Sequence, residues 1–194
     1  MRLSPDTLAS LPGDIAVPSY DREAQAIGIV HFGIGAFHRA HQAWYTDLAL
    51  NAGEQGWAIS GVSLRSASVA EQLNPQDGLY SVTARGGGTS ATRIVGAVRE
   101  VLFAPQDPEA VVARIASPDC RIVSFTVTEK GYARAGDGSL DIAAAEHSFY
   151  PLLAEGLAQR KAAELPGITL LSCDNLAENG QQLTRLMREW LAAK

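Results

Sequence analysis

The sequence predicts an α/β fold with a doubly wound, mostly parallel sheet and a small antiparallel excursion. Short apolar runs alternate along the chain with longer segments whose spacing suits helices. This alternation is typical of a parallel sheet covered by helices on both faces. The first run, 26–32, is short and ends on glycine, as a buried strand does. A pair of β-rich runs separated by glycines supplies the excursion.

Each predicted element follows from its local pattern. Strands are expected at 26–32, 57–62, 121–128 and 168–173. Helices are expected at 37–50, 66–73, 107–116, 147–163 and 176–193. In the third helix Asp107 is a candidate N-cap, since Pro108 suits the first turn. The runs 79–84 and 92–98 flank three glycines, 86–88, which indicates a hairpin.

Composition limits the class of protein. The 194 residues suffice for one domain with a buried core, expected at 26–194 behind an N-terminal arm, 1–25. A net charge of -5 gives no reason to expect nucleic acid or an anionic membrane as a partner. Charged and proline residues interrupt the first fifteen positions, unlike a signal peptide, and no apolar run approaches the ~18 residues of a membrane span. We therefore expect a soluble cytoplasmic protein.

The first strand leads directly into Gly33-Ile34-Gly35-Ala36-Phe37-His38 and then a helix. Two glycines at this spacing allow a tight turn and let the backbone approach a pyrophosphate, while the helix start favours an anion. His38 stands where the full fingerprint has Gly or Ala, so the match is partial. The motif favours a dinucleotide site; the alternative is a tight turn without a ligand.

Polar residues stand at the head of that helix. Arg39 is unfavourable near a helix N-terminus, which indicates an anion beside it, although a solvated arginine is an equal alternative. For His38 and His41 a hydrogen-bonding structural role is favoured over acid–base catalysis. Cys120 and Cys173 belong to no metal-ligand cluster, so no metal site is predicted.

Three strand ends carry candidate ligand contacts, because ligands of such sheets lie beyond the carboxyl ends of the strands. After the second strand, 63–68 contains no acid, and Arg65 either pairs with a 2′-phosphate or points to solvent. Glu129 and Asn175 follow later strands, where each either faces the ligand or forms a turn. Asp174 is an alternative N-cap for the last helix.

Several of these stretches together resemble one family. The segment 29–42, IVHFGIGAFHRAHQ, resembles the opening signature of the polyol-specific long-chain dehydrogenases, which include mannitol dehydrogenases, arabinitol dehydrogenases and fructuronate reductases. Further matches are QDGLY at 76–80, TVTEKGY at 126–132, SCDN at 172–175 and the pair Asn179-Gly180. In order and spacing they cover most of the chain.

The resemblance implies a Rossmann-like domain that binds NAD, with NADP possible, and metal-independent hydride transfer between a polyol (mannitol, arabinitol or mannonate) and its ketose or keto-acid. Asn175 would polarise the substrate carbonyl as half of an oxyanion hole, and Glu129 would line a proton or water path. Ser68 stands where NAD-preferring members carry an acid. The predicted cofactor-binding residues are Phe32, Gly33, Ile34, Gly35, Ala36, Phe37, His38, Arg39, Arg65, Ser68 and Thr128.

The family's acid–base lysine belongs to a helical second domain, which these 194 residues do not include. We therefore expect the chain alone to be inactive, with self-association through the face where that domain would dock. The alternative is a non-catalytic, truncated nucleotide-binding or interaction module. Retained Glu129 and Asn175 argue against that alternative, since a pure binder does not need them.

Overall fold

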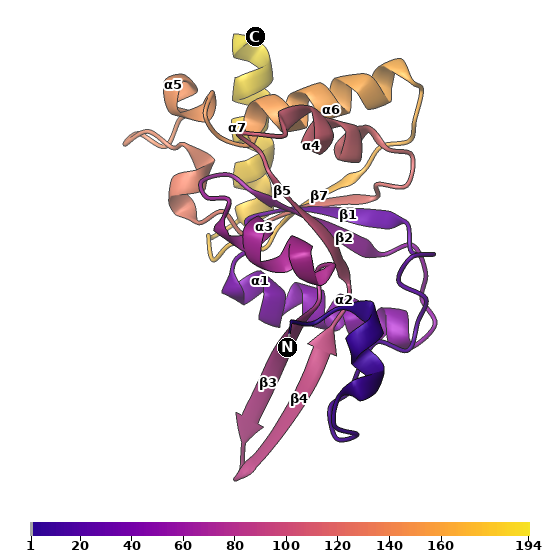
Figure 1. Cartoon of the computed structure of the whole chain (residues 1–194). Helices are drawn as coiled ribbons and strands as arrows, with labels where there is room; N and C mark the ends of the chain where they lie inside the picture. The colour runs from indigo at the N-terminus through magenta and orange to yellow at the C-terminus, as the bar shows by residue number, and fades with distance from the viewer. Residues whose placement is uncertain (1) are drawn as a thin grey trace.

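A five-stranded sheet, entirely parallel, forms the centre of the molecule in the computed structural model, which describes residues 2–194 (Figure 1). The strand order is β5-β2-β1-β6-β7. The strands are β1 (Ile27–Phe32), β2 (Ala58–Ser63), β5 (Val98–Phe103), β6 (Ile122–Phe125) and β7 (Thr169–Ser172). β1 is central, and its Ile29 lies opposite Ile59 of β2 and Ile122 of β6.

Helices cover both faces of this sheet. In Figure 1, α4, α6 and α7 lie on one side and α1, α2 and α3 on the other. The helices are α1 (Ala36–Ala40), α2 (Gln42–Asn51), α3 (Ser68–Leu73), α4 (Pro108–Ala116), α5 (Ile142–Ala145), α6 (Tyr150–Ala162) and α7 (Asn179–Ala193). Short 3₁₀ helices span Pro5–Ser10, Asn74–Gln76 and Glu129–Tyr132. Among residues 2–194 no helix has the length and apolar character needed to cross a membrane.

The core divides into two apolar clusters because successive strand side chains point to opposite faces. Val30 and Phe32 of β1 join one cluster with Trp190 of α7. Ile29 joins the other with Leu50 of α2. A sheet with both faces buried in this way confirms the predicted doubly wound α/β fold.

The strands that follow β1 in the sequence lie first on one side of it and then on the other. From β1 it proceeds outward to β2 and β5, then returns to place β6 and β7 on the opposite side of β1. In open α/β sheets such a switch point leaves a crevice beyond the carboxyl ends of the two central strands. The segments that follow β1 and β6 therefore come together at one edge of the sheet.

The predicted hairpin is present and stands apart from the main sheet (Figure 1). It consists of β3 (Tyr80–Gly86) and β4 (Thr89–Val95), which pair antiparallel. Gly87 and Gly88 form the turn with positive φ angles of 57° and 78°, which glycine adopts without the steric cost of a side chain.

The predicted run 92–98 was wrong at its C-terminal end. β4 stops at Val95, and β5 begins at Val98 as a separate strand that the sequence did not predict. Gly96 and Ala97 lie between the two, and a Cβ on Gly96 would collide with the side chains of Pro18 and Arg22. The sequence of β5, VREVLF, has no continuous apolar run. Val98 and Val101 are buried, and the two residues between them are half-buried.

Other predicted bounds also differ; the helices expected from 66 and 147, for example, begin at Ser68 and Tyr150. The helix at 37–50 is two helices, because the backbone of His41, at φ -120° and ψ -87°, leaves the helical region. The strand predicted at 121–128 spans only 122–125, where its pairing with β1 and β7 ends, and Thr128, with a positive φ of 68°, lies outside the β region. The last helix begins at Asn179 instead of 176.

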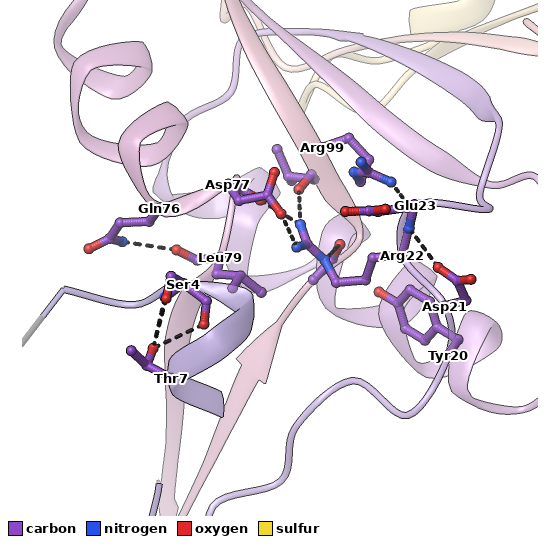
Figure 2. Close-up of polar contacts among 12 residues, drawn as sticks. Ser4, Thr7, Tyr20, Asp21, Arg22, Glu23, Gln76, Asp77, Leu79 and Arg99 are labelled. Atoms are coloured by element: carbon purple, nitrogen blue, oxygen red, sulfur yellow. Dashed lines mark hydrogen bonds and ion pairs between the residues drawn. The ribbon is translucent and has the colours of Figure 1, made fainter. Parts of the chain in front are cut away.

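Residues 2–25 are folded against the body. The backbone of Ala16 pairs with Arg93 of β4. The buried guanidinium of Arg22 donates to the carboxylate of Asp77 at 2.6 Å (Figure 2). It also donates to the carbonyl of Gly96 at 2.9 Å. A buried guanidinium is costly unless acceptors compensate its charge. These two bonds therefore hold the N-terminal segment against Asp77 and the loop that precedes β5.

Candidate functional site

A cleft of about 330 Å³ opens at the carboxyl ends of β1, β2 and β6. The segments directly after these strands line it: 33–35 after β1, 63–65 after β2 and 126–128 after β6. Its remaining lining residues are Val69, Lys130, Gly131, Ala133, Ala144, His147 and Ser148. The cleft thus occupies the switch point of the sheet, where ligands of such folds bind.

The glycine turn shapes the floor of this cleft. Gly33 has a φ of 97°, a left-handed conformation that glycine adopts without strain. A Cβ on Gly33 would also collide with the backbone carbonyl of Thr126. The turns after β1 and β6 are therefore in direct contact, and any larger residue at 33 would separate them.

Positive charge predominates in the cleft. Arg65 and Lys130 both line it, and none of the lining residues drawn from positions 2–194 is Asp or Glu. Both cations are exposed and free to reorient toward a bound anion. A glycine floor with two cations at its rim suits a phosphate-bearing ligand in a chain whose net charge is -5.

The structure brings five of the predicted cofactor-binding residues to this cleft. Gly33, Ile34, Gly35, Arg65 and Thr128 all line it. Gly35 is exposed and is the N-cap of α1, and its carbonyl accepts the first hydrogen bond of that helix, from the amide of Arg39.

The other predicted cofactor-binding residues lie elsewhere. Phe32 is fully buried in the core, and Ala36 is exposed at the first position of α1. The Phe37 side chain is 61% exposed and lines a separate groove, and the Arg39 guanidinium bonds the carbonyl of Ile34 at 3.3 Å. Ser68 begins α3, outside the cleft lining, where its hydroxyl meets that of Ser66. His38 is described next.

His38 points into the protein instead of toward the cleft. Its ring is fully buried and stacks on that of His31, with ring centroids 3.5 Å apart. Neither ring nitrogen of His38 has a hydrogen-bond partner among residues 2–194. Burial lowers the pKa of His38 to about 3, and burial followed by the neighbouring His38 lowers the pKa of His31 well below its usual value. Both rings are therefore neutral at pH 7. The structure places His38 in a structural role, but through ring stacking and not through the hydrogen bonds that were predicted.

The two predicted catalytic residues lie on neighbouring turns. Glu129 is exposed and begins the 3₁₀ helix that follows Thr128. Asn175 is exposed after β7. Between them, Asp174 joins the turns: its carboxylate accepts the amides of Val127 and Thr128 at 3.1 and 2.9 Å.

Asp174 therefore does not cap the last helix, and that alternative was wrong. The helix starts five residues later, and the carboxylate also accepts the hydroxyl of Tyr132 at 2.9 Å. Thr128, which Asp174 holds, combines a φ of 68° with a ψ of 166°, a region sparsely populated by residues other than glycine. The strain lies at the wall of the cleft.

The sequence did not predict the part of the cleft that is formed by Lys130, Gly131, Ala144, His147 and Ser148. The hydroxyl of Ser148 donates to the carbonyl of Gly131 at 2.7 Å and connects the two segments. Lys130 belongs to the TVTEKGY stretch, so its position in a matched motif was an available signal. No local pattern indicates His147, because only the tertiary fold brings it to β1.

Strand order, glycine turn and cleft together define a Rossmann-like α/β protein. Residues 27–194 match the family model described as the mannitol dehydrogenase Rossmann domain, and the chain belongs to this family. The family resemblance found in the sequence is thereby confirmed.

Individual relatives agree with this assignment. The chain is 39% identical to mannitol 2-dehydrogenase of Pyrenophora tritici-repentis, covering 93% of the chain and 34% of the relative. It is 41% identical to polyol:NADP oxidoreductase of Gluconobacter oxydans, covering 90% of the chain and 39% of that relative. The chain thus spans little more than a third of the length of these relatives.

Solved structures extend the comparison to the fold. A substrate-free D-sorbitol dehydrogenase superposes with a TM-score of 0.92 at 37% identity, covering all of this chain and 43% of that one. A Pseudomonas fluorescens mannitol 2-dehydrogenase, in ternary complex with NAD and D-mannitol, superposes with a TM-score of 0.90 at 34% identity, covering 99% and 42%.

Proposed function

We propose that the cleft binds NAD(H) or NADP(H) and that the chain is the cofactor-binding part of an oxidoreductase acting on polyols. The observation that supports this most is the cleft itself: a glycine floor at the switch point, with Arg65 and Lys130 at its rim and no carboxylate among its described lining residues. Membership of the mannitol dehydrogenase family supplies the class of reaction.

The reaction proposed is metal-independent hydride transfer between a polyol, such as mannitol, arabinitol or mannonate, and the corresponding ketose or keto-acid. When bound, the nicotinamide cofactor supplies or accepts the hydride. Reduction of a carbonyl places negative charge on its oxygen, and the neutral amide of Asn175 would donate a hydrogen bond to that oxygen. Glu129, exposed on the adjacent turn, would serve the proton or water path.

Cofactor choice between NAD and NADP depends on the turn after β2. The segment 63–68 has no acid to bond the ribose hydroxyls, and Arg65 is available for a 2′-phosphate. Among the relatives, one is named for NADP and another was solved with NAD. We propose that the site accepts both cofactors.

Titration of the chain with NADH and with NADPH, followed by fluorescence or calorimetry, tests the proposal. Saturable binding of at least one is expected, and absence of binding by both would contradict the cofactor assignment. Ketose- or fructuronate-dependent oxidation of NADH by the 194 residues alone is expected to be undetectable, because the family's lysine is not among them. Robust turnover would show that another group of this chain supplies the proton.

A further inference from the structure

One backbone carbonyl below the cleft receives three hydrogen bonds. The carbonyl oxygen of Gly33 accepts the amide of Gly35 at 2.6 Å, the hydroxyl of Thr126 at 2.7 Å and Nε2 of His31 at 3.2 Å. A carbonyl oxygen usually accepts one or two such bonds. This carbonyl is therefore directed into the protein, away from any anionic ligand in the cleft.

The protonation of His31 follows from these contacts. Because the Gly33 carbonyl can only accept, the proton of the neutral imidazole lies on Nε2, which also bonds Oγ1 of Thr126 at 2.8 Å. Nδ1 is then an acceptor for the hydroxyl of Ser124, whose Oγ lies 2.8 Å away and whose single proton is shared between Nδ1 and Oε1 of Gln42 at 3.1 Å. Ser124, His31, Thr126 and Gly33 form a continuous chain of hydrogen bonds from β6 to the floor of the cleft.

His31 has no surface in the cleft. Its side chain is fully buried within β1, whereas Thr126 and Gly33 both line the cleft. Thr126 follows β6 and Gly33 follows β1, so the imidazole joins the two turns that meet at the switch point. Any influence of His31 on a bound ligand must therefore pass through those two residues.

We propose that His31 is a positioning residue for the nicotinamide cofactor. Its neutral imidazole, oriented by Ser124, fixes the Thr126 hydroxyl and the Gly33 carbonyl, and so sets the shape of the floor against which the cofactor lies. The inference rests on the proposed function, because it takes the ligand of the cleft to be a dinucleotide.

Two substitutions at position 31 separate positioning from packing. His31→Leu fills the space without a donor, and His31→Gln places an amide N–H near the position of Nε2. We expect the Kd for NADH to rise about tenfold in the leucine variant, as for the loss of one or two buried hydrogen bonds. In the glutamine variant it should stay within about threefold of the original value. Thr126→Val and Thr126→Ser should behave as the same pair.

Ser60→Ala is the matched control. Ser60 is a fully buried polar residue on the neighbouring strand β2, and its hydroxyl donates to Glu100 at 2.8 Å, outside the cleft. Its loss should lower the Tm, as the position-31 changes do, but leave the Kd for NADH unchanged. Equal Kd values for His31→Leu and the original chain would overturn the proposal.

A measurement without cofactor keeps this inference separate from the proposed function. In NMR spectra of the free chain, His31 should show the Nε2-protonated tautomer, and hydrogen exchange at the Gly35 amide should accelerate in His31→Leu but not in His31→Gln. An Nδ1-protonated ring, or unchanged exchange in the leucine variant, would overturn the inference. Failure of the original chain to bind NADH and NADPH would instead contradict the cofactor assignment.

Discussion

His31 and His38 stack ring against ring, with centroids 3.5 Å apart and ring planes 17° from parallel. The first comes from β1 and the second from α1, so the contact closes the strand-to-helix turn from within. Both rings are fully buried. Because burial disfavours a charge on either ring, protonation of the pair would destabilise the turn, which makes it sensitive to acid.

Acid should destabilise the fold in the range where unfolded histidine gains a proton. Burial, the largest cause for both rings, lowers the pKa of His38 to about 3 and that of His31 well below its usual value. The unfolded chain therefore binds more protons below about pH 6.5. Stability is fully present above that pH and falls as the pH drops, by on the order of 1 kcal/mol per pH unit for each ring.

Urea unfolding at pH 7, 6 and 5 measures this slope. His38→Gln removes one of the two titrating rings and should make the decline shallower, whatever it does to stability at pH 7. A variant with the same slope as the original chain would show that other groups cause the acid sensitivity.

Asp174→Ala should loosen the wall of the cleft. The carboxylate accepts two backbone amides and the hydroxyl of Tyr132, and it holds Thr128 in a strained conformation. We expect a loss of about 2 kcal/mol in the free energy of unfolding, together with weaker NADH binding. Asp137→Ala is the control, since the hydrogen bonds of that exposed carboxylate to residues 2–194 all lie within its own turn. An equal effect there would count against the role of Asp174.

Arg65→Ala should weaken the binding of NADPH more than the binding of NADH. Removing a charged donor to a 2′-phosphate raises the Kd for NADPH about tenfold, whereas the Kd for NADH should change by no more than about twofold. Arg85→Ala, on the exposed hairpin, controls for the change in net charge. Equal losses for both cofactors would mean that Arg65 contacts a group that they share.

Self-association is predicted through an apolar groove of about 690 Å³ between α2 and β7. Tyr45 and Leu171 line it with exposed side chains, and Phe37 and Trp57 contribute further apolar surface. Sedimentation at increasing concentration should show a reversible dimer that Leu171→Lys abolishes. Leu191→Lys alters an exposed leucine of α7 outside the groove and should leave the dimer intact. A monomer at every concentration would refute the prediction.

The sequence pattern predicted the elements that a few consecutive residues specify by themselves. The apolar run at 26–32, the glycines of the hairpin and the turn at Gly33 each depend on residues close in sequence, and the structure confirms them. β5 was missed because its burial comes from α3 and β2 and not from an apolar run of its own.

The sequence also did not predict that the ring of His38 points into the protein. The sequence predicts it among the cofactor-binding residues, yet its ring packs on His31, between α1 and β1, where the third fingerprint position brings helix and strand together. Asp174 shows the same limit: a polar residue before a helix predicts a cap, but its partners lie 46 and 47 residues away on another turn. Long-range contacts of single side chains decide such cases.

Strand order also has a consequence for synthesis on the ribosome. β1 is among the first segments made, but β6, its partner on one side, is paired through residues 93 positions later, Ile29 with Ile122. At typical translation rates that interval lasts on the order of 10 s. During it the central strand of the sheet has one edge of unpaired backbone groups, which is a template for pairing with another chain.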